Sequence, residues 1–377
     1  MTSDFNVNTF NMLLRETTGG FGSAAYDADL RVHAGYVLTD IEPFEALRLN
    51  IGVRYESGCQ SVTPTALFGL PPAIGNRIDN DYFLPAGTLT YTFAQDMQVC
   101  IAGSRTIARP QFRELAPQPF HDTESSRTFF GNPFLQDSEL TNAEARYEWY
   151  FARDQRFTLA GFYKNIDRPI EATAVQVGST FLTSFATAPR AQFYGAEVEL
   201  VKYVPLDRLR GEYFGSRRLV LIGNYTYTDS EVKVRPGDTT VSFTSAPSPI
   251  DASLVFDTSR KLRLTGQSSH LVNAQVGIED TDRLSQATIL VTYASRRATN
   301  RGLNLTPDFI ETPGVQLDFV AHEGIPFVGK STLELKFEAR NILGTPYRET
   351  QTLGASRLDI NSYDVGLTFG VSAAVTF

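Results

Sequence analysis

The chain has 377 residues, of which 20% are charged and 12% are aromatic, and its formal net charge is -8. This acidic balance argues against a nucleic-acid-binding surface. No stretch approaches the roughly 18 to 20 uninterrupted apolar residues that a membrane-spanning helix needs. Phe and Tyr, which favour strands, far outnumber the single Trp. The composition therefore favours a β-rich protein.

Segments in which apolar and polar residues alternate recur along the chain, as expected for strands with one apolar and one polar face. No amphipathic helix of convincing length competes with them. The predicted strands are 28–39, 46–58, 82–94, 97–108, 137–151, 156–174, 187–203, 217–234, 268–280, 284–297, 308–322, 331–343 and 362–377. The sequence thus predicts an all-β protein with about thirteen strands.

Charged side chains occupy the polar faces of three of these strands. They are Arg48, Arg54, Glu144, Arg146, Glu148, Glu334, Lys336, Glu338 and Arg340. In a membrane-spanning sheet an Arg or Lys facing the middle of the hydrocarbon costs about 2 to 4 kcal/mol, so these residues are predicted to line a wet lumen. A simpler hypothesis is that they form ion pairs that keep the strands in register.

The connections between the predicted strands alternate in length. Short connections lie near 94–97, 152–155 and 280–283, and long ones at 59–81, 109–136, 235–265 and 344–360. The connections 202–218 and 323–330 depart from this rule. A strand tilted near 40° gains roughly 2.6 Å of height per residue, so ten residues cross a ~25 Å apolar band. Strand length and loop asymmetry therefore predict an antiparallel up-and-down transmembrane barrel with its long loops outside.

Alternation alone does not say which face looks outward, and a soluble sandwich would place the apolar face inside. The C-terminal stretch DVGLTFGVSAAVTF favours the membrane, because it alternates over about fourteen residues and ends on Phe377. At a membrane interface a terminal ring can lie among other aromatic residues while the carboxylate stays in water.

Several stretches resemble the barrel of TonB-dependent outer-membrane receptors. They are AGYVLTD at 34–40, LRLNIGVRYE at 47–56, FLPAGTLTYTF at 83–93, SRTIARPQFRELAP at 104–117, GNPFLQDSELTNAEARYEWYF at 131–151, GFYKNIDRPIE at 161–171, FYGAEVEL at 193–200 and FEARNILGTPYRE at 338–349. The combination of ARPQFRELAP, GNP and GFYKNID is more specific to this family than any single strand. The resemblance covers nearly the whole chain from about residue 28 onward.

The resemblance implies a 22-stranded barrel preceded by a plug domain and an energy-coupling box, and we find no segment similar to either of the latter two. We therefore interpret residues 28–377 as the C-terminal portion of such a barrel. Residues 1–27 are expected to form an extracellular loop or an irregular segment.

Function and partners follow from the resemblance. It implies a receptor in the bacterial outer membrane that binds a scarce nutrient, of siderophore or carbohydrate type, and imports it with TonB-coupled energy. Expected partners are outer-membrane lipid, the nutrient, a TonB-type complex acting through a plug, and the outer-membrane assembly machinery. The last of these would recognise the C-terminal strand through Phe369, Val371, Ala373, Val375 and Phe377.

Ligand selection is expected in the long outer loops, because loops carry recognition residues more often than scaffolds do. The candidates are Arg109, Phe112, Arg113, His121, Phe129 and Phe130.

No catalytic, cofactor-binding or metal-binding pattern stands out. His33, His121, His270 and His322 are scattered without ligand spacing. The sequence therefore predicts a protein that is not an enzyme, with no cofactor and no nucleic-acid partner. Two alternatives to the receptor remain: a passive, smaller porin-like channel that closes by itself, and a soluble all-β binding module.

Overall fold

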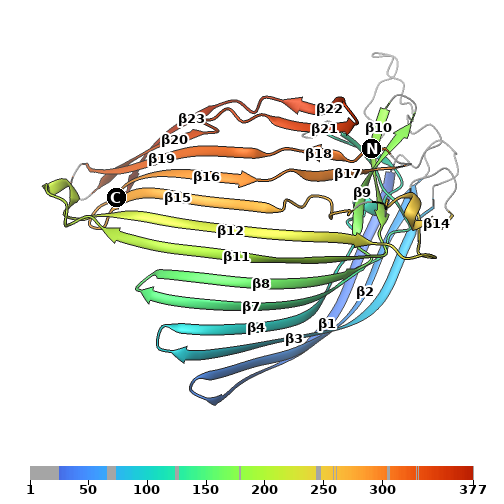
Figure 1. Ribbon diagram of the computed structural model, residues 1–377, viewed down its shortest axis with the longest axis horizontal. Coiled ribbons are helices and arrows are strands. Elements are labelled where there is room, and N and C mark those ends of the chain that lie inside the picture. Colours follow the sequence, from blue (N-terminus) through green and yellow to red (C-terminus); the bar gives the residue numbers. More distant parts are fainter. Residues whose placement is uncertain are drawn as a thin grey trace, which may run out of the picture.

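The structure, a computed structural model, describes residues 25–65, 74–123, 127–177, 180–242, 248–257, 259, 261–303, 306–327, 329 and 331–376. Within these residues, thirteen strands form one antiparallel sheet in which spatial order follows chain order (Figure 1). The strands are β1 (Ala25–Phe44), β2 (Leu47–Thr65), β3 (Asn76–Ala94), β4 (Met97–Ala108), β7 (Ser138–Ala152), β8 (Gln155–Asp167), β11 (Arg190–Pro205), β12 (Arg217–Lys233), β15 (His270–Asp280), β16 (Ser285–Ala294), β19 (Gly314–Pro326), β20 (Thr332–Arg340) and β23 (Thr368–Thr376). Each corresponds in order to one predicted strand, which confirms the all-β prediction.

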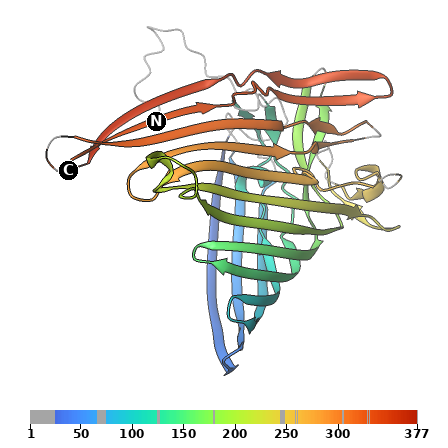
Figure 2. The ribbon, with the colours of Figure 1, turned by 60° about the vertical axis from the view of Figure 1, so that its left-hand side comes forward.

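The sheet is strongly twisted and remains open. The blue N-terminal strands and the red C-terminal strands run in clearly different directions, as the accumulated twist of a large sheet requires (Figure 2). Among the described residues β1 pairs only with β2, and β23 pairs only with β20. The chain therefore forms a partial barrel wall. No helix in the described part of the chain is long and apolar enough to cross a membrane.

The apolar side chains of this sheet are exposed. Leu335 and Phe337 on β20 are 37% and 38% exposed, and Val371, which pairs with Phe337, is 79% exposed. A soluble sandwich buries this face against a second sheet. Exposure of the apolar face is instead what a wall facing lipid requires. We call this face outward and the opposite, charged face inward.

Three predicted strands are interrupted. The segment 156–174 divides into β8 and β9 (Ile170–Val177), and Arg168 (φ 57°) and Pro169 lie at the break. The segment 308–322 divides into β18 (Phe309–Glu311) and β19, which begins at Gly314 (φ 73°). A left-handed backbone turns the chain out of an extended strand, and proline removes a ladder donor.

The C-terminal prediction of one fourteen-residue strand is also wrong. Residues 356–376 form β22 (Ser356–Tyr363) and the nine-residue β23, separated by a segment that contains Gly366 (φ 78°). Phe377 lies outside the described residues. The predicted loop 59–81 is likewise shorter than expected, because β2 continues to Thr65 and β3 begins at Asn76.

The long connections form a second sheet that the sequence did not predict. Its order is β22-β21-β18-β17-β9-β10-β6-β5, and we call it the loop sheet. The strands not yet given are β5 (Pro119–Asp122), β6 (Arg127–Phe130), β10 (Thr180–Thr187), β17 (Arg297–Gly302) and β21 (Tyr347–Leu353). Parallel pairs join β10 to β6 and β17 to β9, so hairpins from four different connections share one ladder.

Smaller elements complete the loop region. They are α2 (Phe112–Leu115), β13 (Thr239–Thr240), β14 (Ile250–Asp251) and η2 (Ala252–Leu254). The turn η1 (Glu212–Phe214) lies instead in the connection between β11 and β12, at the opposite end of the wall. Two apolar clusters hold the loop region together. One gathers around Phe256, Val255 and Ala191, and the other around Leu115, Leu135 and Val62. The dry core of the described chain therefore lies among the loops, while the outward face of the wall is exposed.

Candidate functional site

The inward charges of β7 lie together in a pocket. Arg146 lies between two carboxylates of its own strand, at 3.1 Å from Glu144 and 3.3 Å from Glu148. On the neighbouring strands, Arg156 of β8 and Glu199 of β11 form an ion pair at 2.6 Å. The pocket has a volume of about 450 Å³. Its lining residues are Glu144, Arg146, Glu148, Tyr150, Arg156, Thr158, Ala160, Phe162, Glu197 and Glu199, and we call it the wall pocket.

Three of the charges in the wall pocket were missed at the sequence level: Arg156, Glu197 and Glu199. Apolar and polar residues alternate in β8 and β11, and this pattern indicates only that the three side chains lie on a polar face. Only the register of β8 and β11, in which Thr158 pairs with Glu199, puts them beside the β7 charges. With four carboxylates and two guanidinium groups, the pocket is acidic.

The remaining inward candidates also form ion pairs. Arg54 lies 2.7 Å from Glu56. On β20, Lys336 and Arg340 lie 3.1 Å and 3.3 Å from Glu338. These contacts support the ion-pairing hypothesis for individual residues, and lumen lining stays a prediction for the set.

Two further inward candidates make cross-strand contacts. Arg48 of β2 donates from Nε to Asp40 of β1 at 3.0 Å. Glu334 accepts a hydrogen bond from the Thr376 hydroxyl at 2.7 Å and lies 3.7 Å from the His322 ring. These contacts join adjacent strands of the wall.

Four of the six loop candidates contact other parts of the protein. Arg109 forms a 2.6 Å ion pair with Glu56, and its side chain is mostly buried. Phe129 stacks on Phe185, Phe130 is buried, and Phe112 packs against the Leu115 cluster. All four connect the β4–β7 loop to its surroundings.

The other two loop candidates are exposed. Arg113 donates to the Gln111 side chain at 3.0 Å, and His121 lies 3.4 Å from the Thr128 hydroxyl. A ligand-binding role for any of the six stays a prediction. Of the C-terminal set, Phe369 and Val371 are 65% and 79% exposed on the outward face, and Ala373 and Val375 share that face by alternation.

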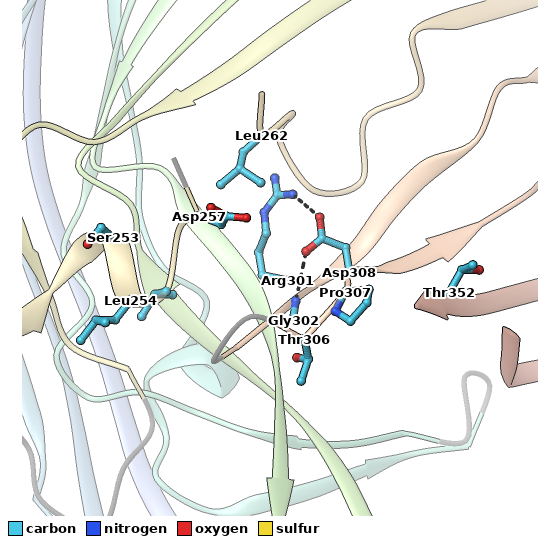
Figure 3. Close-up of a pocket in the computed structure, with 11 residues that line it drawn as sticks. Ser253, Leu254, Asp257, Leu262, Arg301, Gly302, Thr306, Pro307, Asp308 and Thr352 are labelled. Carbon is cyan, nitrogen blue, oxygen red and sulfur yellow. Dashed lines mark hydrogen bonds and ion pairs between the residues drawn. The ribbon is translucent and has the colours of Figure 1, made fainter. Parts of the chain in front are cut away.

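A buried ion cluster holds the loop sheet together, and sequence analysis did not identify it. Arg301 of β17 is 2% exposed and lies 2.9 Å from Glu171 of β9. It also lies 3.0 Å from Asp308 (Figure 3). Asp308 also accepts a hydrogen bond from the backbone N–H of Gly302 at 3.1 Å. The backbone N–H of Thr265 donates to Glu171 at 3.2 Å. Burial raises the pKa of Glu171, although Arg301 opposes this shift.

A second polar cluster lies on the same sheet. Arg127 of β6 pairs with Glu349 of β21 and donates to the Asn300 side chain at 2.8 Å. Asn300 in turn donates to the Thr183 hydroxyl of β10 at 2.7 Å. The two clusters together connect all five long connections from β4–β7 to β20–β23. No local pattern could reveal them, because their partners come from distant segments.

A pocket of about 510 Å³ lies beside Arg301. It is lined by Ser253, Leu254, Val255, Asp257, Leu262, Arg301, Gly302, Thr306, Pro307, Asp308 and Thr352 (Figure 3). Apolar side chains and charged groups share its walls, which suits non-covalent binding of a small amphipathic molecule. In the part of the chain that the structure describes, no three His, Cys, Asp or Glu residues are grouped to hold a metal ion.

The comparison with protein families decides the assignment. The family model described as TonB dependent receptor-like, beta-barrel, matches residues 2–342. The chain belongs to the TonB-dependent receptor family. The comparison with curated proteins gave no match.

Solved structures of receptors resemble this family member in fold. The siderophore receptor PiuA from Acinetobacter baumannii has a TM-score of 0.60 and 14% identity, and the match covers 93% of this chain and 44% of PiuA. The ferric yersiniabactin uptake receptor FyuA from Yersinia pestis has a TM-score of 0.60 and 15% identity, and the match covers 93% of this chain and 46% of FyuA. The ferric-catecholate import receptor Fiu from E. coli K12 has a TM-score of 0.55 and 14% identity, and the match covers 86% of this chain and 42% of Fiu. The TonB-dependent receptor barrel described here spans less than half the length of these receptors.

Proposed function

We propose that the chain acts in the bacterial outer membrane as part of a receptor that binds a siderophore-type nutrient and takes part in its TonB-coupled import. The observation that carries this proposal is the division of one sheet into an exposed apolar face and an ion-paired charged face. Membership of the TonB-dependent receptor family supports the energy coupling, which would act through a plug. The siderophore type is supported by PiuA, FyuA and Fiu, and a carbohydrate remains the other nutrient class.

In this proposal the outward and inward faces of the wall meet different surroundings. The outward residues meet lipid, and the inward charges meet water and the moving nutrient. The loop sheet, held by its buried ion clusters, would supply the outer binding surface. The exposed apolar face does not fit the soluble-module alternative, because a protein in water leaves such patches small.

The test uses the chain as its own cell makes it. Deleting the gene and measuring uptake of a panel of radiolabelled ferric siderophores should abolish uptake of one class, and an uncoupler of the proton gradient should do the same in the parent strain. Fractionation should place the chain in the outer membrane, with migration on gels that changes after heating. A chain in the soluble fraction, or uptake that survives the uncoupler, would contradict the proposal, and the second outcome would favour a passive channel.

A further inference from the structure

The connection between β11 and β12 is longer than the other connections at its end of the wall. β11 ends at Pro205 and β12 begins at Arg217, and we call the residues between them, 206–216, the β11–β12 extension. In Figure 1 the extension is the yellow-green coil at the left end of the ribbon, opposite the loop sheet. Because the loop sheet would face the outside of the cell, the extension belongs to the periplasmic end of the wall.

Backbone hydrogen bonds fix the extension in place. The Leu206 N–H donates to the Arg217 carbonyl at 2.9 Å and closes the base of the extension. In the neighbouring β15–β16 turn, the Thr281 N–H donates to the Ser216 carbonyl at 2.8 Å. The extension is therefore attached both to its own hairpin and to the next one.

The extension packs on the outward face of the wall. Arg217 belongs to the outward series of β12, which continues through Leu219 and Leu221. Its guanidinium lies 4.0 Å from the centre of the Tyr213 ring and donates to the Ser285 hydroxyl at 3.1 Å. With these neighbours the Arg217 side chain is only 13% exposed. Tyr213 therefore covers an outward charge, and its ring lies on the same side of the wall as the apolar side chains.

Arg217 marks the lower edge of the apolar band. The outward series of β12 ends in charge at Asp229, ten residues after Leu219, which corresponds to about 26 Å of height against an apolar band of ~25 Å. Arg217 lies about 5 Å below Leu219 on the same scale. A second basic–aromatic pair lies on the outward face at this end of the wall, where the Lys202 amino group is 5.0 Å from the centre of the Phe151 ring. Aromatic rings are enriched at the boundary between the hydrocarbon and the headgroups of a membrane.

The exposed surface of the extension combines apolar and basic side chains. Leu209 is 52% exposed and Tyr213 is 58% exposed. Arg208 and Arg210 flank Leu209 in the sequence and are exposed, as is the acidic neighbour Asp207. The leucine and the ring continue the apolar face of the wall below its band, and the two guanidinium groups present donors that fit phosphate. Segments that pair apolar with basic side chains lie at the boundary between headgroups and acyl chains.

We propose that the β11–β12 extension is an anchor that binds phospholipid in the inner leaflet of the outer membrane. Leu209 and Tyr213 enter the boundary of the acyl chains, while Arg208 and Arg210 donate to lipid phosphates. The proposal rests on the outer-membrane location given under Proposed function. Because the extension lies on the outward face, it is separate from the path of the nutrient and acts on the position of the wall in the membrane.

The experiment follows a single indole in the full chain, which is purified and reconstituted into vesicles of phosphatidylethanolamine with a minor share of phosphatidylglycerol. The chain has one tryptophan, Trp149, on the outward face of β7. Leu209→Trp in a Trp149→Phe background moves the indole to the extension. Phospholipid brominated on its acyl chains should quench this indole. Iodide on both sides of the membrane should quench it at least about threefold more weakly than an indole in water.

Matched variants test whether the signal belongs to the extension. Leu353→Trp, in the same background, places the indole at a leucine of the loop sheet that is 69% exposed, where iodide should quench it and the brominated lipid should not. Replacing both Arg208 and Arg210 by alanine in the Leu209→Trp chain should lower quenching by the lipid at least about twofold, and replacing both by lysine should largely preserve it. Arg153→Ala, in the exposed β7–β8 turn, should leave the quenching unchanged.

Migration on gels that changes after heating confirms that each variant is folded before it is compared. If iodide quenches the indole at position 209 as strongly as the one at position 353, the anchor is overturned. The proposed receptor function then still stands if brominated lipid quenches Trp149 in the natural chain. If Trp149 is not quenched, the wall is not in the bilayer, and the membrane location falls together with the anchor. Equal quenching with and without the two arginines would overturn the role given to the lipid phosphates.

Discussion

Arg301 and Glu171 are 130 residues apart in the sequence, yet they form a 2.9 Å ion pair in which both side chains are almost completely buried. Removing one partner of a buried pair leaves an uncompensated charge, which typically costs about 3 to 5 kcal/mol. We therefore expect Arg301→Ala to open the loop sheet while the thirteen-stranded wall persists. Hydrogen exchange should accelerate in β9 and β17 and stay slow in β11 and β12. Arg357→Ala, in an exposed pair, serves as the control, and equal effects of the two variants would contradict this expectation.

The buried carboxyl of Glu171 should make the loop sheet sensitive to pH. Because burial raises the pKa of Glu171 above its value in an unfolded chain, the folded state holds the proton more tightly. Its contribution to stability is therefore fully present below the unfolded pKa and is lost as pH rises through the folded pKa. Arg301 and the Thr265 N–H contact the Glu171 carboxyl, and Asp308 contacts Arg301 from its other side; all three remain in Glu171→Gln.

Protection factors of β9 amides, corrected for intrinsic exchange, should accordingly fall from mildly acidic to neutral pH in the natural chain. The fall should be smaller in Glu171→Gln. Protection that increases with pH in the natural chain would rule out this assignment.

The wall pocket should influence transport more than stability. Arg146→Ala leaves four carboxylates beside the single guanidinium of Arg156. A more acidic lumen should slow passage of an anionic ferric siderophore, by about threefold or more, because charge in a narrow passage acts on charged solutes strongly. Arg153→Ala is a matched control in an exposed turn, where the side chain is 97% exposed. Uptake rates at equal protein level make the comparison, and identical rates in the two variants would exclude a role for the pocket.

One glycine is required where β11 meets its neighbours. A Cβ at Gly195 would lie 2.7 Å from the Phe162 ring and even closer to the Tyr227 carbonyl. At Gly87 the nearest atom, the Asn50 carbonyl oxygen, would be 3.7 Å away. Gly195→Ala should therefore cost about 1 to 3 kcal/mol by overpacking, and Gly87→Ala far less. The amount of folded, heat-modifiable protein reports the difference, and an equal yield from both variants would refute it.

The last strand tests which face meets lipid. Val371→Lys places a charge on the outward face and should cost about 2 to 4 kcal/mol if it lies near the membrane centre. Ala374→Lys places the same charge inward, opposite Glu334 in the register, and should be tolerated. Membrane-assembled protein, measured after fractionation, should fall only for the first variant. A loss confined to Ala374→Lys would reverse the assignment of the faces.

The wall was predictable because its information is local. Alternation of apolar and polar residues identifies each strand, as in segment 331–343, and shows which side chains share a face. Short connections make consecutive strands pair, so the strand order of the sheet follows from the chain order. Gly366 and the Pro313–Gly314 pair even carried the signal for two of the breaks, since such residues interrupt ladders. What the sequence could not reveal was which loops meet. Arg301 lies in a stretch without regular alternation of apolar and polar residues. Its partner Glu171 comes close only because β17 and β9 pair in the loop sheet.

The strands of the wall differ in length, so the wall is taller at its N-terminal side than at its C-terminal side. β1, β2 and β3 have 20, 19 and 19 residues, whereas β20 and β23 have nine each. At roughly 2.6 Å of height per residue, nine residues give about 23 Å, slightly less than an apolar band of ~25 Å, whereas the N-terminal strands are about twice as long as such a band requires. Hairpins β17–β18 and β21–β22 lie above the short strands, and the β4–β7 loop packs against the long N-terminal strands. A molecule arriving from outside would therefore meet long strands covered by the β4–β7 loop on one side and hairpins above short strands on the other, so the two sides of its path differ.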